Sequence, residues 1–381
     1  MKVIAFHLPQ YHRIPENDSW WGEGFTEWEN VKTARKYHEG QYQPRIPLDE
    51  NYYNLLDESA LEWQCEIAKE YGIYGFCFYH YWFNGHMLLE KPVEKYRALE
   101  KHKKVHYCIC WANENWTKAW ADKANEVLIQ QKYGDKEEWA AHFQYFLPFF
   151  NDEMYIKENG KPLIVIYRPE LIYNLKEMLE SWQEMSILNG FPGLSICYQQ
   201  YSYLVHHGSE EKLFSHNIEY QPAYVLAQDR MKHMSWKEKM YHCAPDFLRK
   251  KYEKVKSNTT RVVHDEKQFQ VFDYDTVWER ILNSEPSSPK SIPGAFIDFD
   301  NSPRRKDRGT YFRGVSIEKF KSYFTRQIKH ARCDYGSDYL FFFAWNEWGE
   351  SAYLEPDALR KYSALEAIKS ALIDTGELEN D

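Results

Sequence analysis

The sequence predicts an α/β protein, a (β/α)8 TIM barrel with long insertions after strand 1 and between strands 6 and 7. Three observations predict this fold. Eight short apolar runs recur along the 381 residues, helical patterns separate most of them, and polar and aromatic residues gather where the runs end. A doubly wound open sheet is the alternative, but the chain contains neither a G-x-G-x-x-G nor a phosphate-loop motif.

Each expected strand is a short run rich in Val, Ile, Phe and Tyr, as in a parallel strand that is buried on both faces. The strands are expected at residues 3–8, 73–79, 105–111, 163–167, 194–198, 218–220, 295–299 and 339–344. Helical spacing lies between or after them at residues 59–71, 92–102, 136–150, 171–185, 317–331 and 358–372. This alternation of strand and helix favours a parallel sheet.

Two segments interrupt the alternation. Residues 9–57 separate the first strand from its helix and are dense in Trp, Tyr, Pro and Gly. Residues 226–292 hold a basic helical run at 236–256 and little that resembles a strand. Long loops of this kind in compact domains are usually functional. Because the sequence shows neither a low-complexity linker nor an internal repeat, we predict one barrel domain over residues 1–381.

Composition excludes several classes of partner. The formal net charge is -9, so no basic surface for nucleic acid is expected. No stretch approaches the ~20 apolar residues of a membrane span, and the first residues lack the apolar region of a signal peptide. We therefore expect no membrane insertion and a cytoplasmic location. The seven Cys are odd in number and form no C-x-x-C pair, which indicates reduced thiols and no metal site. The oligomeric state stays open.

Chemistry in such a barrel takes place at the carboxyl ends of the strands. One ring or polar group there is more often structural than functional, but clusters at eight successive ends indicate a site. The candidate sugar-binding residues are Glu27, Trp28, Tyr79, His80, Trp82, Trp111, Asn113, Glu114, Trp116, Tyr167, Tyr198, Tyr220, Asp300, Asn301, Asn346 and Trp348. We expect the five Trp side chains among them to offer flat apolar faces on which sugar rings stack.

Strand 8 ends in the most informative segment, Phe341-Phe342-Phe343-Ala344-Trp345-Asn346-Glu347-Trp348-Gly349-Glu350. Paired carboxylates beside indole rings are what glycosidic bond chemistry needs, so Glu347 and Glu350 are the candidate catalytic residues. Residues three apart on a strand point to opposite faces. The two can therefore share a site only if the backbone leaves strand geometry near Trp348, and Gly349 permits that bend.

Several long, Trp-rich motifs resemble the WbsX-like glycosyltransferases of polysaccharide gene clusters, which are related to glycoside hydrolase family 99. The resemblance covers nearly the whole chain. Its motifs are Leu8-Pro9-Gln10-Tyr11-His12, Trp20-Trp21-Gly22, Gly24-Phe25-Thr26-Glu27-Trp28, Gln43-Pro44-Arg45-Ile46-Pro47, Tyr79-His80-Tyr81-Trp82-Phe83, Trp111-Ala112-Asn113-Glu114-Asn115-Trp116-Thr117, Asp300-Asn301-Ser302-Pro303-Arg304 and Asn346-Glu347-Trp348-Gly349-Glu350.

The resemblance implies a retaining endo-α-mannosidase type of chemistry on a (β/α)8 barrel that needs no cofactor. One glutamate removes a proton from the substrate 2-hydroxyl, whose oxygen attacks the anomeric carbon, and the other protonates the leaving oxygen. By motif position these roles fall on Glu347 and Glu350 respectively, so we expect Glu347 to be ionised and Glu350 to hold the proton. The chain departs from the hydrolases at Gly349, where they typically have His.

Three functions remain open at this point. The first is a glycoside hydrolase that acts on α-linked mannose-like sugars inside a glycan or polysaccharide. The second is a glycosyltransferase of lipopolysaccharide or capsular polysaccharide assembly, which the basic run Arg304-Arg305-Lys306 after strand 7 would suit through phosphate binding. The third is a carbohydrate-binding barrel without catalysis, which would leave Glu347 and Glu350 without a role.

Overall fold

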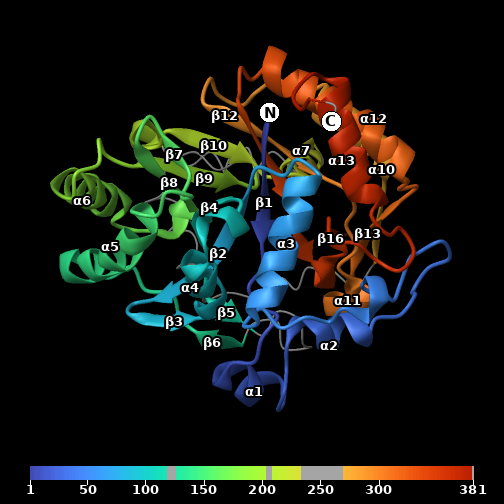
Figure 1. Ribbon diagram of the computed structural model, residues 1–381, viewed down its shortest axis with the longest axis horizontal. Coiled ribbons are helices and arrows are strands. Elements are labelled where there is room, and N and C mark those ends of the chain that lie inside the picture. The colour runs from blue at the N-terminus through green and yellow to red at the C-terminus, as the bar shows by residue number, and fades with distance from the viewer. Residues whose placement is uncertain (118–125, 203–207, 233–268, 380–381) are drawn as a thin grey trace.

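The computed structural model describes residues 1–117, 126–202, 208–232 and 269–379. Its centre is a closed barrel of eight parallel strands (Figure 1). In chain order the strands are β1 (Lys2–His7), β2 (Gly75–Phe83), β4 (His106–Trp111), β8 (Lys161–Ile166), β9 (Ser195–Gln200), β10 (His216–Glu219), β12 (Ser291–Phe296) and β14 (Tyr339–Phe343). The barrel closes because β1 pairs with both β2 and β14, so that Ala5 aligns with Phe76 on one side and with Phe342 on the other. The predicted (β/α)8 fold is confirmed.

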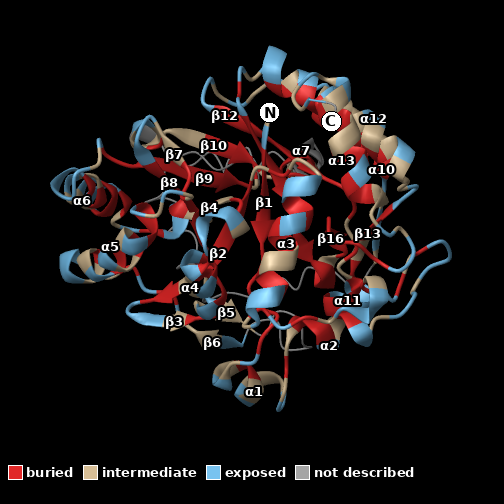
Figure 2. Ribbon diagram, in the orientation of Figure 1, coloured by how far each residue is buried: buried red, intermediate tan, exposed pale blue. Residues whose placement is uncertain are grey.

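Helices surround the barrel and turn their apolar faces toward it. They are α3 (Glu58–Glu70), α4 (Lys91–Ala98), α5 (Lys136–Phe150), α6 (Leu175–Leu188), α7 (Ala223–Lys232), α10 (Tyr274–Leu282), α12 (Ile317–Cys333) and α13 (Ser363–Asp374). Figure 2 shows barrel strands that are mostly buried and helices whose outer faces are exposed. This two-sided burial explains why the strands are continuous apolar runs, whereas the helices are amphipathic.

Most predicted elements lie where the sequence placed them. Helix α5 covers the predicted residues, because the side chain of Asp135 accepts hydrogen bonds from the backbone N–H groups of Glu137 and Glu138 and fixes its start. Strand β12 begins at Ser291, four residues before the predicted start. Helix α10 was missed inside the second insertion, although Asp273 caps it in the same way. The predicted helical run at 236–256 lies outside the described residues.

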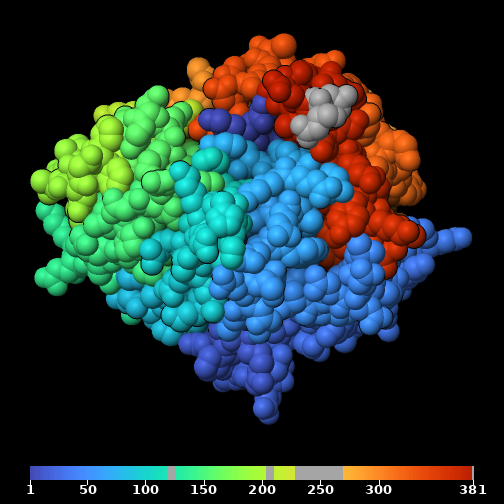
Figure 3. Space-filling view, viewed as in Figure 1, coloured from blue at the N-terminus to red at the C-terminus, as the bar shows by residue number. Residues whose placement is uncertain are grey.

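Short elements cover the carboxyl ends of the strands. They are α1 (Pro15–Trp21), α2 (Glu27–Lys32), β3 (His86–Leu88), β5 (Trp116–Thr117), β6 (Val127–Ile129), α11 (Ser302–Arg305), β15 (Asn346–Glu347) and β16 (Ala352–Tyr353). Three more strands lie elsewhere, namely β7 (Lys157–Glu158), β11 (Gln270–Asp273) and β13 (Thr310–Arg313). In Figure 1 the first insertion, with α1 and α2, lies at the end opposite both termini, and Figure 3 shows its atoms forming that end of the surface.

Side chains of alternate strand residues fill the barrel interior. Tyr79 from β2 lies within 3.3 Å of Gln199 from β9 and of Tyr220 after β10, measured at its hydroxyl oxygen. Strand β2 is a neighbour of neither β9 nor β10 in the barrel, so these contacts cross its interior. The thiol of Cys110 points to Gln199 as well. The residues next to them in sequence, such as His80, therefore point outward to the helices.

Candidate active site

The two glutamates after β14 meet at one arginine. The chain leaves β15 in a 3-10 turn over Trp348–Glu350, so the backbone departs from strand geometry where predicted. Arg304 Nη2 donates to Glu347 Oε2 at 2.9 Å, and Nη1 lies 2.9 Å from Glu350 Oε1. Both nitrogens belong to one planar guanidinium, so the two carboxylate oxygens are at most about 8 Å apart.

A third carboxylate completes this cluster. Glu27, at the start of α2, accepts a hydrogen bond from Arg304 Nε at 2.7 Å. Its side chain is fully buried, while Glu350 keeps a quarter of its side-chain surface exposed. A Cβ atom at Gly349 would lie 1.8 Å from Glu27 Oε1 and 2.7 Å from Arg304 Nε. Glycine at this position therefore provides the room for the buried ion pair.

Burial controls the protonation of the cluster. It raises the pKa of Glu347 to about 8, against the opposing charge of Arg304 and with the help of the negative charges of Glu350 and Glu27. Burial also raises the pKa of Glu27, again opposed by Arg304. The 2.9 Å ion pair by itself would favour an ionised Glu347, but one guanidinium serves three carboxyls, so burial prevails. The direction of this pKa shift is opposite to the expectation that Glu347 stays ionised at neutral pH.

A segment of the first insertion holds α11, and with it Arg304, in place. The side-chain nitrogen of Gln41 donates to Asp300 Oδ2 at 2.7 Å and to Ser302 Oγ at 3.0 Å. The side-chain nitrogen of Gln43 donates to the same Asp300 oxygen at 2.9 Å and to Ser351 Oγ at 2.9 Å. Asp300 also donates its backbone N–H to the Glu350 carbonyl at 2.7 Å. The loops that carry the arginine and the acids are thus joined.

Tyrosine side chains line the barrel mouth beside the acids. The charge of Glu347 adds to burial in raising the pKa values of Tyr79 and Tyr81. The charge of Glu350 likewise adds to burial in raising those of Tyr167 and Tyr220. These phenols keep their protons and can donate hydrogen bonds to oxygen atoms of a ligand. Tyr79, Tyr167 and Tyr220 were predicted site residues, whereas Tyr81 was missed.

A second ionic cluster lies at the ends of β4 and β8. Arg168 is ion-paired with Glu114 and with Glu170, and it donates from Nη2 to the Tyr201 hydroxyl at 2.8 Å. The side chain of Glu114 is 41% exposed, so it can still meet a ligand. Burial of its carboxyl nevertheless raises the pKa of Glu114, against the charge of Arg168. Burial raises the pKa of Tyr167, and the charges of Glu114 and Glu350 both add to this shift, so Tyr167 lies near both clusters.

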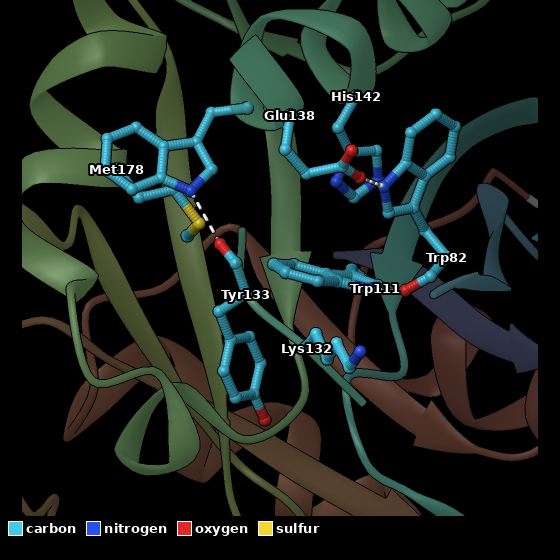
Figure 4. Close-up of a pocket in the computed structure, with 8 residues that line it drawn as sticks. Trp82, Trp111, Lys132, Tyr133, Glu138, His142 and Met178 are labelled. Carbon is cyan, nitrogen blue, oxygen red and sulfur yellow. Dashed lines mark hydrogen bonds between the residues drawn. The ribbon is translucent and has the colours of Figure 1, made fainter. Parts of the chain in front are cut away.

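Three predicted sugar-binding residues point away from the mouth. Trp82 stacks on His142 of α5 with ring centroids 4.4 Å apart and donates to Glu138 Oε1 at 2.6 Å. Trp111 packs against His142 as well, and His80 Nε2 lies 3.1 Å from His142 Nε2. Figure 4 shows Trp82, Trp111 and His142 around a small pocket between the barrel and helices α5 and α6. These side chains build the core outside the barrel, which corrects the prediction.

Three further aromatic residues were predicted to bind sugar, but their side chains are buried or point away from the barrel mouth. Trp28 is buried and donates from Nε1 to the Tyr53 carbonyl at 2.8 Å. Trp348 is buried, stacks on Tyr353 at 3.7 Å between ring centroids and donates to Glu355. Both rings are thus used in packing the first insertion onto the strand-8 loop. Tyr198 points outward, where its hydroxyl donates to Glu211 at 2.9 Å. Trp116 is only half-buried, against Tyr81, with ring centroids 4.8 Å apart.

Four polar side chains that were predicted to bind sugar form hydrogen bonds to other groups of the protein instead. Asn113 exchanges two hydrogen bonds with the backbone of Arg168. Asn346 does the same with the backbone of Leu8 and thereby ties strand 8 to strand 1. Asn301 accepts from the backbone N–H of Thr310, and Asp300 accepts from the glutamines described above. Strand ends leave backbone groups without ladder partners, and these side chains satisfy them.

Comparison with known proteins agrees with this architecture. A family model described as "Glycosyltransferase WbsX" matches residues 3–368. The chain belongs to this family. Two proteins called "Uncharacterized protein WxcX", from Xanthomonas campestris pv. campestris strains B100 and ATCC 33913, are each 31% identical over 373 residues. The alignments cover 97% of this chain and 49% of each relative, so the chain spans about half the length of the curated relatives it matches. The family description names a glycosyltransferase, which is one class of carbohydrate-active enzyme.

Solved structures share the fold of this WbsX-family chain at low identity. A GH99 endo-alpha-mannosidase from Bacteroides thetaiotaomicron superposes with a TM-score of 0.55 at 12% identity, over 98% of this chain and 97% of the other. Its complex with BIS-TRIS-propane gives 0.57 at 12% identity, over 99% and 97%. A "Glycoside hydrolase-like protein" gives 0.53 at 13% identity, over 97% and 93%. These likenesses establish the barrel architecture.

Among the residues that the structure describes, no three His, Cys, Asp or Glu side chains come together as ligands for a metal ion. In the same parts of the chain, every helix is too short or too polar to cross a bilayer.

Proposed function

We propose that this protein processes α-linked mannose-like sugars in a glycan or polysaccharide, with retention of configuration and with Glu347 and Glu350 as the catalytic pair. The observation that carries the proposal is the attachment of both carboxyls to Arg304 at the strand-carboxyl end of the barrel. Active sites of TIM barrels lie at this end. Two carboxyls within about 8 Å are also within the range of known glycosidase geometries.

The proposed reaction uses the substrate's own 2-hydroxyl. One carboxylate takes the hydroxyl proton while the oxygen forms a bond to the anomeric carbon. The bond from that carbon to the leaving oxygen breaks, and the other carboxyl gives its proton to the leaving oxygen. Water or an acceptor hydroxyl then attacks the anomeric carbon and opens the anhydro sugar. The attacking hydroxyl gives its proton to the second carboxylate, and the first carboxyl returns its proton to the 2-oxygen of the sugar. Family position assigns the first role to Glu347 and the second to Glu350.

The pKa of Glu347 makes this assignment testable. As a base, Glu347 must first lose the proton that burial retains up to a pH of about 8. We therefore expect kcat/KM to rise with pH and to level off above about pH 8. If Glu347 were instead the acid, kcat/KM would fall through the same pH region. The profile of wild type beside Glu347→Gln distinguishes the two assignments.

Substrate contacts are proposed for the residues that face the acids. Tyr79, Tyr167 and Tyr220 would donate hydrogen bonds to sugar hydroxyls, and Glu114 would accept them. The half-buried ring of Trp116 would stack on a sugar face farther from the cleavage point. Phenols and carboxylates of this kind recognise a polyhydroxylated ligand, which supports a carbohydrate as the partner.

Glycosyl transfer is the second candidate, and one observation favours it beyond the family description. The residues that follow Arg304 are basic and include the exposed side chains of Arg305, Lys306 and Arg308. They lie after β12, where phosphate groups bind in many barrels, so they would suit a sugar donor that carries a phosphate. In that case the same two acids would serve an acceptor hydroxyl instead of water.

A screen with product analysis tests the proposal. The purified protein is incubated with α-mannosides, α-rhamnosides and bacterial polysaccharides in water enriched in oxygen-18, and the products are weighed by mass spectrometry. Hydrolysis adds one labelled oxygen to the new reducing end, whereas transfer gives an unlabelled, longer glycan. Glu347→Gln and Glu350→Gln are the matched controls. Full activity in both variants would refute the proposed site.

A further inference from the structure

We propose that Arg304, anchored by Glu27, is a positioning residue that holds the two acids as a pair and keeps one shared proton among the three carboxyls. Arg304 is not among the residues that the motif assigns to catalysis. The inference rests on the proposed function only for its activity readout. Its protonation readout stands without that function.

Each of the three nitrogens of the Arg304 guanidinium contacts a different carboxyl. Nε serves Glu27 at 2.7 Å, Nη2 serves Glu347 at 2.9 Å, and Nη1 lies 2.9 Å from Glu350. The group is planar, so fixing Nε on Glu27 fixes the directions of both other nitrogens. Glu27 is fully buried and Arg304 keeps only 7% of its side-chain surface exposed. The anchor therefore determines how the two acids are aligned.

The net charge of the cluster explains why it retains one proton. With all groups ionised, three carboxylates and one guanidinium carry a net charge of about -2 in a site that is largely closed to water. Taking up one proton reduces this to about -1 and lowers the cost of burial. Glu27 Oε2 is buried and has no hydrogen-bond partner in the part of the chain that the structure describes. An ionised Glu27 would leave that oxygen unsatisfied, which also favours a proton within the cluster.

Among the described residues, the other titratable groups that face the cluster do not supply a compensating positive charge. They are Tyr11 of the first insertion, Tyr79 and Tyr81 of β2, Tyr167 after β8, Tyr220 after β10, and Glu355 of the strand-8 loop. Burial raises the pKa of each of these phenols, so they stay neutral. Burial also raises the pKa of Glu355 to about 7, so this carboxyl does not neutralise the excess negative charge either.

Two substitutions should move the proton in opposite directions. Glu27→Gln keeps an acceptor for Arg304 Nε but removes one negative charge, so Glu347 should lose its proton at lower pH. Arg304→Met removes the only cation of the cluster, so Glu347 should keep its proton to higher pH. We expect shifts of about one pH unit or more in each direction. Arg304→Lys keeps the positive charge but lacks the planar guanidinium. The pH at which Glu347 is half protonated should therefore lie between the values of the wild type and Arg304→Met.

The measurement is carbon-13 NMR of protein labelled at the glutamate carboxyls, with the Glu347 signal assigned by its loss in Glu347→Gln. The exposed pair Glu279 and Arg326 provides matched controls, because Glu279→Gln and Arg326→Met should leave the Glu347 midpoint unchanged. Opposite shifts support the inference. Shifts in one direction, or none, overturn it. If Arg304→Met does not fold, the downward shift in Glu27→Gln decides alone.

Activity separates this inference from the proposed function. On a substrate found in the screen, the pH at which kcat/KM is half-maximal should move with the NMR midpoint in each variant. If the midpoints move and no glycan is turned over, the proposed function fails and the positioning role stands. If turnover is found and the midpoints do not move, the positioning role fails and the function stands.

Discussion

Replacing Glu347 with Gln should stabilise the protein, and the gain should grow with pH. In the folded protein burial raises the pKa of Glu347 to about 8, whereas an unfolded glutamate keeps its ordinary value of 4.5. Between these values the folded state binds a proton that the unfolded state has lost. The free energy of unfolding of the wild type therefore falls as pH rises through this window, by about 1.4 kcal/mol per pH unit for one proton.

The expected difference is large enough to measure. From pH 5 to 8 one retained proton amounts to about 4 kcal/mol, a sizeable part of the stability of an ordinary domain. Gln at this position can still accept a hydrogen bond from Arg304 but does not titrate. Burial lowers the pKa of His7 to about 4, so this residue makes the free energy of unfolding rise with pH in acid. His7 is present in both proteins, so its contribution cancels in the difference between them.

The assay is urea unfolding of wild type and Glu347→Gln at about pH 5, 6, 7 and 8. Glu355→Gln serves as a matched control, because burial raises the pKa of Glu355 to about 7 and its removal should leave the Glu347 difference unchanged. A pH-independent difference would refute the reasoning. A difference that is constant over this range, with Glu347→Gln less stable than the wild type, would mean that the ion pair with Arg304 outweighs burial and keeps the folded pKa of Glu347 at or below its ordinary value.

Three further predictions follow from contacts of the site. Gly349→Ala should cost about 3 kcal/mol or more in urea unfolding, because its Cβ would meet the buried carboxylate of Glu27; the cost should shrink in a Glu27→Ala background, and equal costs would contradict this cause. Trp111→Ala should lose about 3–5 kcal/mol of stability, whereas the half-buried Trp116→Ala should lose little stability but weaken glycan binding, as measured by calorimetry. Glu350→Gln should spare aryl glycosides with good leaving groups more than natural linkages, because a good leaving group needs little protonation; an equal loss on both would argue against its role as the acid.

The fold was predictable because its main signal is local. Apolar runs and amphipathic helices repeat in order along the chain, and a cap such as Asp135 marks a helix start in the sequence. Helix α10 carries the same kind of cap at Asp273 but was missed. It lies between the end of a long insertion and strand β12, so the regular spacing of strand and helix that identified the others is lost there.

The direction of side chains at the strand ends was only partly predictable. Strands buried on both faces show no apolar alternation, so the sequence pattern does not say which residues face the barrel interior. Polar residues within the strands could have indicated which side chains face the barrel interior. Gln199 faces the interior, so Tyr198 must face outward. The same parity relates Tyr79 to His80 and explains why Tyr81 faces the acids, whereas Trp82 faces helix α5.

Arg304 was not predictable as the centre of the site, because its role depends on three segments that are distant in sequence. The arginine follows β12, the acids follow β14, and the anchor Glu27 lies in the first insertion. The sequence nevertheless contains one trace of this contact. Gly349 has no side chain, and any Cβ there would collide with Glu27 and Arg304. A glycine at residue 349 and the buried ion pair therefore depend on one another. It follows that a histidine introduced at residue 349 should require the removal of Glu27 as well, since neither side chain leaves room for the other.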